Sequence, residues 1–117
     1  MSARRRSGAI ATRKLQESAP IFAALGDDTR LSIVTKLSTG SRLSIAALTE
    51  GSSMSRQAIT KHLRVLEGAG LIRGARRGRE SLFELEREPL DEARRALDVI
   101  SEQWDHALER LRAFVEE

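Results

Sequence analysis

Residues 55–66 read SRQAITKHLRVL and have the spacing of an α-helix with two chemically different faces. Ile59, Leu63 and Leu66 recur at i, i+4 and i+7, so a helix places them on one side, where they can pack into a core. The opposite side carries hydrogen-bond donors that include three cations and no anion, namely Arg56, Gln57, Thr60, Lys61 and Arg64. A solvated helix face usually mixes both signs of charge, so this pattern favours an anionic partner.

The residues around this stretch predict a helix-turn-helix. Apolar residues at helical spacing indicate a short helix over 42–51, and Ser55 is the expected N-cap of the helix that follows. Gly68-Ala69-Gly70 marks the end of that second helix. Two helices joined by a short turn form a helix-turn-helix over 43–68, whose second helix, the recognition helix, enters the major groove of DNA.

A β-hairpin, or wing, is expected next, over 71–86. Two short alternating runs flank Arg77-Gly78, where a tight turn is predicted. The tip carries Arg76, Arg77 and Arg79, which can reach a phosphate backbone or the minor groove; a tip that is cationic only for solubility is the alternative. The fold class is therefore mainly α with a small β-hairpin, a winged helix-turn-helix.

The last segment, 89–116, predicts a long helix that serves dimerisation. Its apolar residues keep a heptad spacing: Leu90, Leu97, Trp104 and Leu111, interleaved with Ala93, Ile100, Ala107 and Phe114. Such a helix is roughly 40 Å long, more than one small domain covers easily, so part of it is expected to meet a second subunit. Packing across its own domain is the alternative. The expected dimer interface comprises Ile21, Phe22, Leu25, Leu90, Leu97, Ile100, Trp104 and Leu111.

The N-terminal part is divided into an arm and the start of the domain. Residues 1–17 are expected to form a flexible basic arm; an incidental disordered terminus is the alternative. The domain then spans 18–117. Ser18 and Pro20 signal a first short helix, and Asp27-Asp28-Thr29 signals a second.

The composition of the chain argues against several classes of function. The chain has 117 residues, which is the size of one domain, and no cysteine, so it has neither disulfide nor thiolate chemistry. No Ser-His-Asp set, glycine-rich phosphate loop or carboxylate pair is visible, so we expect neither an enzyme nor a cofactor. No apolar stretch approaches the roughly 20 residues of a membrane span, and no secretory signal is visible, so we expect a cytoplasmic protein.

Charge divides the chain into two parts. Residues 1–79 hold 15 Lys or Arg and 5 Asp or Glu, a net charge of +10. Residues 80–117 hold 5 and 12, a net charge of −7. The first part therefore suits a polyanion such as DNA, whereas the last part does not.

Three blocks in this order resemble the arsenical-repressor (ArsR) family of winged-helix regulators: FAALGDDTRLSIVTKL, LSIAALTEGSSMSRQAITKHLRVLEGAGLI and RRGRESLFEL. They fall roughly within residues 20–86. The resemblance implies a homodimeric repressor whose first and last helices form the dimer interface. Family members often have Asp-Pro-Thr-Arg where this chain has Asp27-Asp28-Thr29-Arg30, a change that a helix start tolerates.

The metal-site residues of the family are missing. Thiolate members place Cys in the helix that matches Leu43 to Thr49, and this chain has none. Members that sense through the last helix would need ligands at Ala93 and Arg95, although His106 and Glu109 fit the second half of their motif. We therefore expect no metal site, and a surface site formed by Glu102, Asp105, His106 and Glu109 is the alternative to a solvated face.

Individual roles follow from this fold. The DNA-binding residues are expected to be Ser55, Arg56, Gln57, Thr60, Lys61, Arg64, Arg76, Arg77 and Arg79. Arg56 or Gln57 could read base edges, whereas Thr60 and Lys61 are expected at phosphates. His62 lies at the margin of the apolar stripe, so a structural role is favoured and a phosphate contact is second. Trp104 is expected to pack in the seam.

The resulting hypothesis is a sequence-specific regulator of double-stranded DNA, a homodimeric ArsR-type repressor without metal sensing. Two alternatives stay open: a winged-helix module that binds another protein, and a regulator that responds to a small organic ligand. The effector, the operator and the regulated genes cannot be deduced from the residues.

Overall fold

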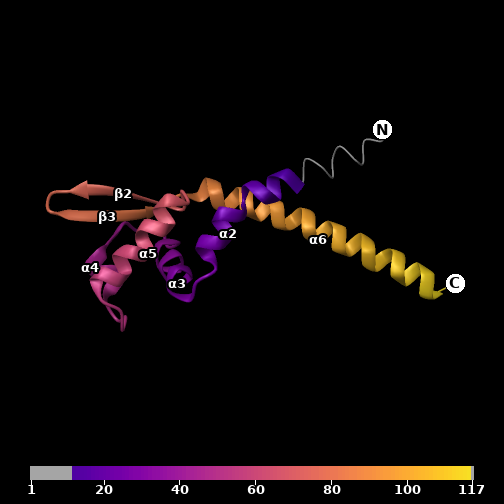
Figure 1. Cartoon of the computed structure of the whole chain (residues 1–117), viewed down its shortest axis with the longest axis horizontal. Helices are drawn as coiled ribbons and strands as arrows, with labels where there is room; N and C mark the ends of the chain where they lie inside the picture. The colour runs from indigo at the N-terminus through magenta and orange to yellow at the C-terminus, as the bar shows by residue number, and fades with distance from the viewer. Residues whose placement is uncertain (1–11, 117) are drawn as a thin grey trace.

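The computed structural model describes residues 12–116. Its recognition helix, α5 (Arg56–Gly68), contributes one face to the hydrophobic core. A hairpin projects from one end of the molecule and a long helix from the other (Figure 1). The remaining elements are α2 (Ala19–Leu25), α3 (Asp28–Leu37), β1 (Leu43–Ser44), α4 (Ile45–Thr49), β2 (Ile72–Arg77), β3 (Glu80–Leu85) and α6 (Arg87–Glu116). Within the described residues, none of the helices is long and apolar enough to cross a membrane.

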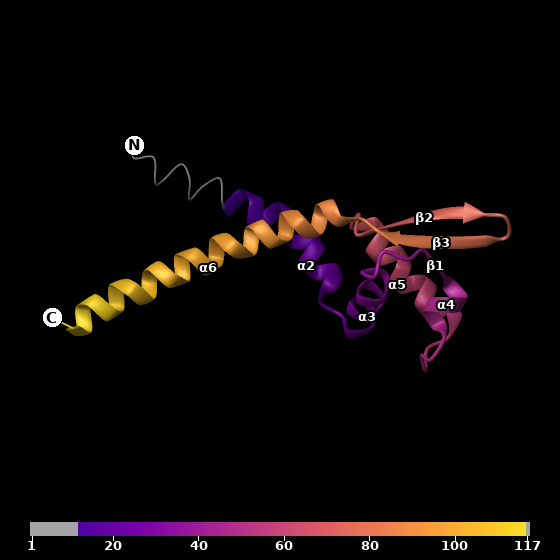
Figure 2. The same cartoon turned by 180° about the vertical axis from the view of Figure 1, so that it is seen from behind.

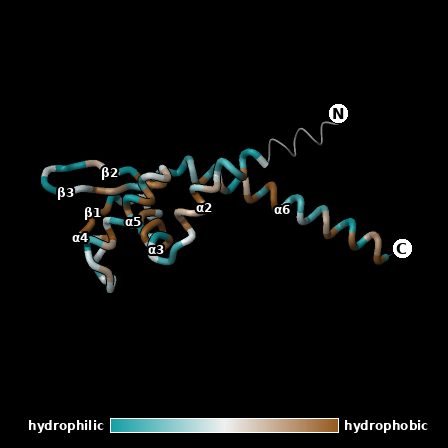
Figure 3. Tube along the Cα trace, viewed as in Figure 1, coloured by the Kyte–Doolittle hydropathy of each residue, from teal (hydrophilic) through white to brown (hydrophobic). Residues whose placement is uncertain are grey.

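The apolar stripe of α5 forms the middle of the core, as its spacing predicts. Ile59, Leu63 and Leu66 are each 1% exposed or less. They pack with buried residues of α2, α3, α4 and β2 and with Ala93 of α6. In Figure 3 the hydrophobic segments gather where α2, α3, α4 and α5 pack together. Along α6, by contrast, hydrophobic and hydrophilic residues alternate.

Side-chain caps fix where three of the helices begin. The hydroxyl of Ser55 accepts a hydrogen bond from the Ala58 N–H at 3.1 Å, which confirms Ser55 as the N-cap of α5. Asp27 caps α3, and Ser44 caps α4. Ser18, which can cap a helix by its residue type, precedes α2 but makes no side-chain cap hydrogen bond. Each cap satisfies an N–H group that the helix itself leaves free, so these residues set the helix starts.

The helix expected over 42–51 is shorter than predicted. Leu43 and Ser44 form strand β1, which pairs antiparallel with β3 through Leu43↔Phe83 and Ser44↔Leu82. The sheet therefore has three strands in the order β1-β3-β2. The sequence prediction was wrong here because the apolar Leu43 packs beside Phe83 at the edge of the core, a contact that local spacing does not reveal.

The hairpin turn is shifted by one residue from its expected place. Arg77 pairs with Glu80, so the loop is Gly78-Arg79 and not Arg77-Gly78. Gly78 has φ +63°, and none of the non-glycine residues in the described part has a positive φ. This is the pattern of a two-residue loop with glycine in its first position, and it places Arg79 in the loop itself.

The two ends of the described chain are both helical. Residues 12–17, which were expected to belong to a flexible basic arm over 1–17, form a helix; Arg4, Arg5 and Arg6 lie outside the described residues. Helix α6 begins at Arg87, so that Pro89 lies in its first turn, where no backbone donor is needed. Figure 2 shows the N-terminal helical segment beside the first half of α6.

The second half of α6 extends beyond the body of the molecule. Only Ala93 and Ala96 of this helix are buried. The radius of gyration is 19.2 Å, whereas a compact chain of this length has a value of about 13 Å. The elongated shape follows from a helix whose C-terminal half has no partner within the described chain (Figure 1).

Candidate nucleic-acid interface

The polar face of α5 is open to solvent. Arg56, Gln57, Lys61 and Arg64 are exposed, on the side opposite the buried stripe. Within residues 12–116, none of these cations has an ion-pair partner. Their donors are therefore free for a ligand. We infer that the packing of Ile59, Leu63 and Leu66 holds this face outward.

Two neighbouring hydroxyls already have structural roles. The Ser55 hydroxyl caps the helix, and the Thr60 hydroxyl donates to the Arg56 carbonyl at 2.7 Å. Thr60 is also half-buried. The Thr60 hydroxyl has thereby used its one donor, whereas the Ser55 hydroxyl only accepts at the cap and keeps its O–H for an anion. The donors available to an anion on this face are therefore those of the three cations, Gln57 and Ser55.

The wing contains two kinds of arginine. Arg76, Arg77 and Arg79 lie at the tip, are exposed and form no ion pair in the described structure. Arg73 at the base instead donates from Nη2 to Glu84 Oε1 at 2.5 Å and lies 3.2 Å from Glu86. Only the tip arginines are thus free to meet another anion.

Glu84 joins three strands at the base of the wing. Its second carboxylate oxygen accepts from Arg42 Nε at 2.9 Å, just before β1, while the first binds Arg73 on β2. The hydrogen bonds from Arg73 and then Arg42 lower the pKa of Glu84, and Glu84 raises the pKa of Arg73. This clamp could not be predicted from the sequence, because Arg42 and Glu84 are 42 positions apart.

A second contact ties the wing to the recognition helix. Glu67 Oε2 accepts a hydrogen bond from the Gly74 N–H at 3.2 Å, and a Cβ on Gly74 would lie 3.0 Å from the Phe83 ring. β2 is an edge strand, so this N–H has no strand partner on its outer side. The same Cβ would lie 3.0 Å from Glu67 Oε2, so a side chain at position 74 would press on both the wing and α5, which the sequence did not indicate.

His62 lies between two charged residues of α3. Its Nδ1 is 3.3 Å from Arg30 Nη1 and 3.7 Å from Asp27 Oδ2, and its side chain is only 19% exposed. The hydrogen bond from the Arg30 N–H is the largest cause of the lowered pKa of Asp27. This position agrees with the structural role favoured for His62.

The expected dimer residues separate into two groups. Ile21 is 8% exposed and belongs to the chain's own core, and Phe22, Leu25 and Leu90 pack partly against that core. The other four are exposed on α6: Leu97 by 50%, Ile100 by 46%, Trp104 by 64% and Leu111 by 58%. Leu108, Phe114 and Val115 extend the same apolar surface. An interface between two copies would therefore rest on α6 from Leu97 onward.

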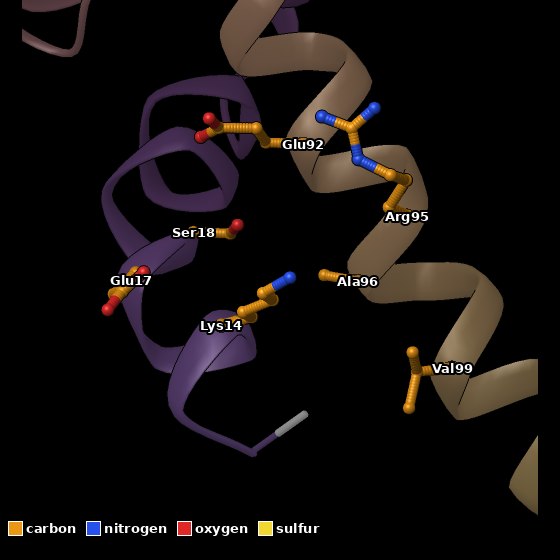
Figure 4. Close-up of a pocket in the computed structure, with 7 residues that line it drawn as sticks. All are labelled: Lys14, Glu17, Ser18, Glu92, Arg95, Ala96 and Val99. Carbon is orange, nitrogen blue, oxygen red and sulfur yellow. The ribbon is translucent and has the colours of Figure 1, made fainter. Parts of the chain in front are cut away.

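A cavity of about 360 Å³ lies between the N-terminal helical segment and α6. Figure 4 shows the Lys14 ammonium and the Ser18 hydroxyl directed toward α6, with Ala96 and Val99 as the apolar side. Glu17, Glu92 and Arg95 complete the lining. Its volume is at the lower end of the range for small-molecule sites.

Metal ligands do not gather in the described part of the chain. Among residues 12–116, no three His, Cys, Asp or Glu side chains form a group that could hold a metal ion. His106 and Glu109 are exposed on α6, and Ala93 is buried against the core. The residues at the positions of the family's metal sites therefore do not fit such an ion.

Known proteins resemble this chain in both sequence and structure. A helix-turn-helix domain family matches residues 25–75. An uncharacterised HTH-type transcriptional regulator of Bacillus subtilis (strain 168), YuzN, is 43% identical over 76 residues, which is 60% of this chain and 83% of that protein.

Two solved structures are similar over most of their length. An ArsR-like transcriptional regulator from Rhodococcus sp. RHA1 has a TM-score of 0.72 and 35% identity, covering 85% of this chain and 92% of that one. A second ArsR family transcriptional regulator has a TM-score of 0.70 and 30% identity, covering 77% and 92%. The likeness thus includes the body that carries the cationic face of α5 and the wing.

Proposed function

Because the chain belongs to the ArsR family of helix-turn-helix transcriptional regulators, we propose that it acts as a homodimeric repressor that binds double-stranded operator DNA and does not sense a metal. The observation that carries the proposal is the distribution of arginine partners. The cations of the α5 face and the wing tip are unpaired within the described chain, whereas Arg42 and Arg73 bind Glu84. Free donors thus gather on the two surfaces that a winged helix presents to DNA.

The two surfaces have different tasks. Arg56 and Gln57 are at the N-terminal end of α5, so they are proposed to reach base edges in the major groove, where bidentate pairs discriminate between bases. Lys61 and Arg64 lie one and two turns further along the helix and are proposed to bind phosphates. Arg76, Arg77 and Arg79 are proposed to bind the neighbouring backbone or minor groove.

The apolar surface of α6 supports the dimer. Trp104 and Leu111 are mostly exposed although they are among the largest apolar side chains of the helix. Contiguous apolar surface of this kind is rare on a monomer unless it binds something, and a second copy offers the same stripe. In a two-fold dimer the two recognition helices are proposed to lie in successive major grooves about 34 Å apart.

The absence of metal sensing is part of the proposal. It rests on the lack of cysteine in the sequence and on Ala93 and Arg95, which stand where the last-helix ligands would be required. The signal would then have to come from another source.

A direct test compares two double variants of equal charge. Lys61→Ala with Arg64→Ala removes two cations from the α5 face, and Arg94→Ala with Arg110→Ala removes two exposed cations from α6. Fluorescence anisotropy with the DNA upstream of the chain's own gene should show at least tenfold weaker binding for the first pair and near-normal binding for the second. Normal affinity for the first pair would overturn the assignment of the α5 face to DNA, and a wild-type chain that binds no DNA would favour a protein-interaction module.

The cavity beside α6 favours one further possibility, a response to a small organic ligand. Ser18 is only 5% exposed, and its hydroxyl faces the cavity without making a cap bond (Figure 4). A thermal-shift screen of small carboxylates, amines and zwitterions tests this, with an Ala96→Trp variant to fill the space. Stabilisation of the wild type that disappears in the variant would support the site, and no stabilisation would exclude these classes.

A further inference from the structure

Arg30 connects three helices through one side chain. Its Nε donates to the Ala24 carbonyl at 2.7 Å, and its Nη2 lies 3.5 Å from the Ala23 carbonyl, both near the C-terminal end of α2. Its Nη1 lies 3.3 Å from His62 Nδ1 on α5. Arg30 itself belongs to the first turn of α3, where its N–H donates to Asp27 at 3.0 Å.

The chemistry of the guanidinium suits this junction. The last carbonyls of a helix lack intrahelical donors and carry the negative end of its dipole, so a cation stabilises them. Arginine presents donors in a rigid fork, which lets one side chain serve α2 and α5 together. Arg30 uses two different nitrogens, Nε and Nη1, for these two sites, whereas the three donors of a lysine ammonium all leave one nitrogen and cannot keep the same spacing.

The same contact defines the state of the His62 ring. A guanidinium only donates, so a hydrogen bond from Arg30 to His62 requires Nδ1 to accept and the ring proton to lie on Nε2; the opposite tautomer would turn an N–H toward Asp27 and lose this bond. Asp27 Oδ2 lies 3.7 Å from the same Nδ1. A carboxylate oxygen only accepts, so Asp27 cannot donate to Nδ1 as Arg30 does.

We propose that Arg30 and His62 form a positioning pair that fixes the orientation of the recognition helix relative to the α2–α6 unit. This inference rests on the proposed function, because α6 is the surface on which the dimer would form. α2 packs against α6, and His62 is adjacent in sequence to Lys61, so the pair lies between the dimer surface and the DNA-binding face. Neither residue needs to contact DNA for operator binding to depend on it.

A dimer makes this orientation important. Both recognition helices must enter grooves one duplex turn apart at the same time, so a tilt of α5 displaces both from register. Binding to a single half-site requires no such register. Loss of the pair should therefore weaken binding to a full palindrome much more than binding to an isolated half-site.

The competing role for His62 is a phosphate contact through its Nε2 proton. Two amide substitutions separate the alternatives, because the amide of asparagine occupies the place of Nδ1 and that of glutamine the place of Nε2. His62→Asn keeps an acceptor for Arg30, whereas His62→Gln keeps a donor for a phosphate.

The test measures anisotropy of full-palindrome and half-site DNA with His62→Asn, His62→Gln and Arg30→Lys, after circular dichroism and light scattering have verified fold and mass. We expect His62→Asn to remain within about threefold of wild type on both DNAs. His62→Gln and Arg30→Lys should lose about tenfold or more on the palindrome and less than threefold on the half-site. Normal binding by His62→Gln together with loss in His62→Asn would overturn the proposal, and so would normal binding by Arg30→Lys.

A measurement without DNA separates this proposal from the proposed function. Nitrogen chemical shifts of the His62 ring in the free protein at neutral pH should show an unprotonated Nδ1 and a protonated Nε2, and Arg30→Lys should abolish this preference. A protonated Nδ1 would overturn the pair whatever the DNA result. Wild-type protein that binds no DNA would instead refute the proposed function, and the positioning role with it, while the ring shifts still decide whether the Arg30–His62 bond exists.

Discussion

Glu67 and Gly74 join the recognition helix to the wing, through a hydrogen bond of 3.2 Å from the Gly74 N–H to the Glu67 carboxylate. The cationic face of α5 and the wing, which are proposed to bind DNA, are therefore held in one relative position. Phe83 lies against the same glycine, so a Cβ at position 74 would be in tight contact with the Phe83 ring and with Glu67 Oε2.

Gly74→Ala should loosen this junction. The added Cβ would lie 3.0 Å from the Phe83 ring, and we expect a loss of about 1–3 kcal/mol in the free energy of unfolding, as for other overpacked sites. Urea denaturation measures this. Ala75→Ser, at an exposed neighbour on the opposite face of β2, is the control and should stay within about 0.5 kcal/mol of wild type. Equal stability of both variants would contradict the packing account.

The wing tip should contribute to the salt dependence of DNA binding. Changing Arg76, Arg77 and Arg79 to Gln should lower the slope of log K against log salt by about 0.9 for each phosphate contact that is lost. Arg73→Gln is the matched control, because Arg73 is engaged by Glu84 and Glu86 and should leave the slope almost unchanged. A larger change for Arg73→Gln than for the tip variants would show that the tip does not meet DNA.

The clamp at Glu84 should depend on pH in a defined direction. Its pKa in the folded state lies below the ordinary value near 4.5, so its stabilising effect is present above that value and is lost as the pH falls through the folded-state pKa. Glu84→Gln should therefore lower the melting temperature at pH 7 and have progressively less effect below about pH 4.5. Melting curves between pH 7 and pH 3 test this, and a difference that grows on acidification would contradict it.

The apolar surface of α6 should control the oligomeric state. Trp104 is 64% exposed within one chain, so Trp104→Glu should leave the fold intact while breaking the dimer. Replacing a central aromatic anchor of an interface often weakens association by about 100-fold or more, so light scattering should show a monomer at micromolar concentration. Gln103→Glu adds the same charge outside the stripe and should remain dimeric. A dimeric Trp104→Glu variant would place the interface elsewhere.

The sequence predicts the elements that depend on local patterns. The α5 stripe is buried as its spacing requires, and Ser55 caps the helix. The wing and the long last helix also form where alternation and heptads predict them, within two residues at their starts. These features depend on residues close together in the chain, so local sequence patterns are sufficient to predict them.

Contacts between distant residues could not be predicted in this way. β1 forms because Leu43 meets Phe83, and the charge of Arg42 and Arg73 is balanced by Glu84, which their own segments do not reveal. Arg30 appeared only as part of a helix start, although its side chain reaches α2 and α5. The candidate site is thus predictable in its exposed cations but not in the contacts that position them.

Hydroxyl-radical footprinting of the wild-type protein on the DNA upstream of its own gene tests the central claim most directly. A dimer with one α5 in each of two successive major grooves should protect two patches about one duplex turn apart, with flanking protection where the arginine tips of the wings meet the backbone. Uniform cleavage at saturating protein, or a single unpaired patch, would contradict the account.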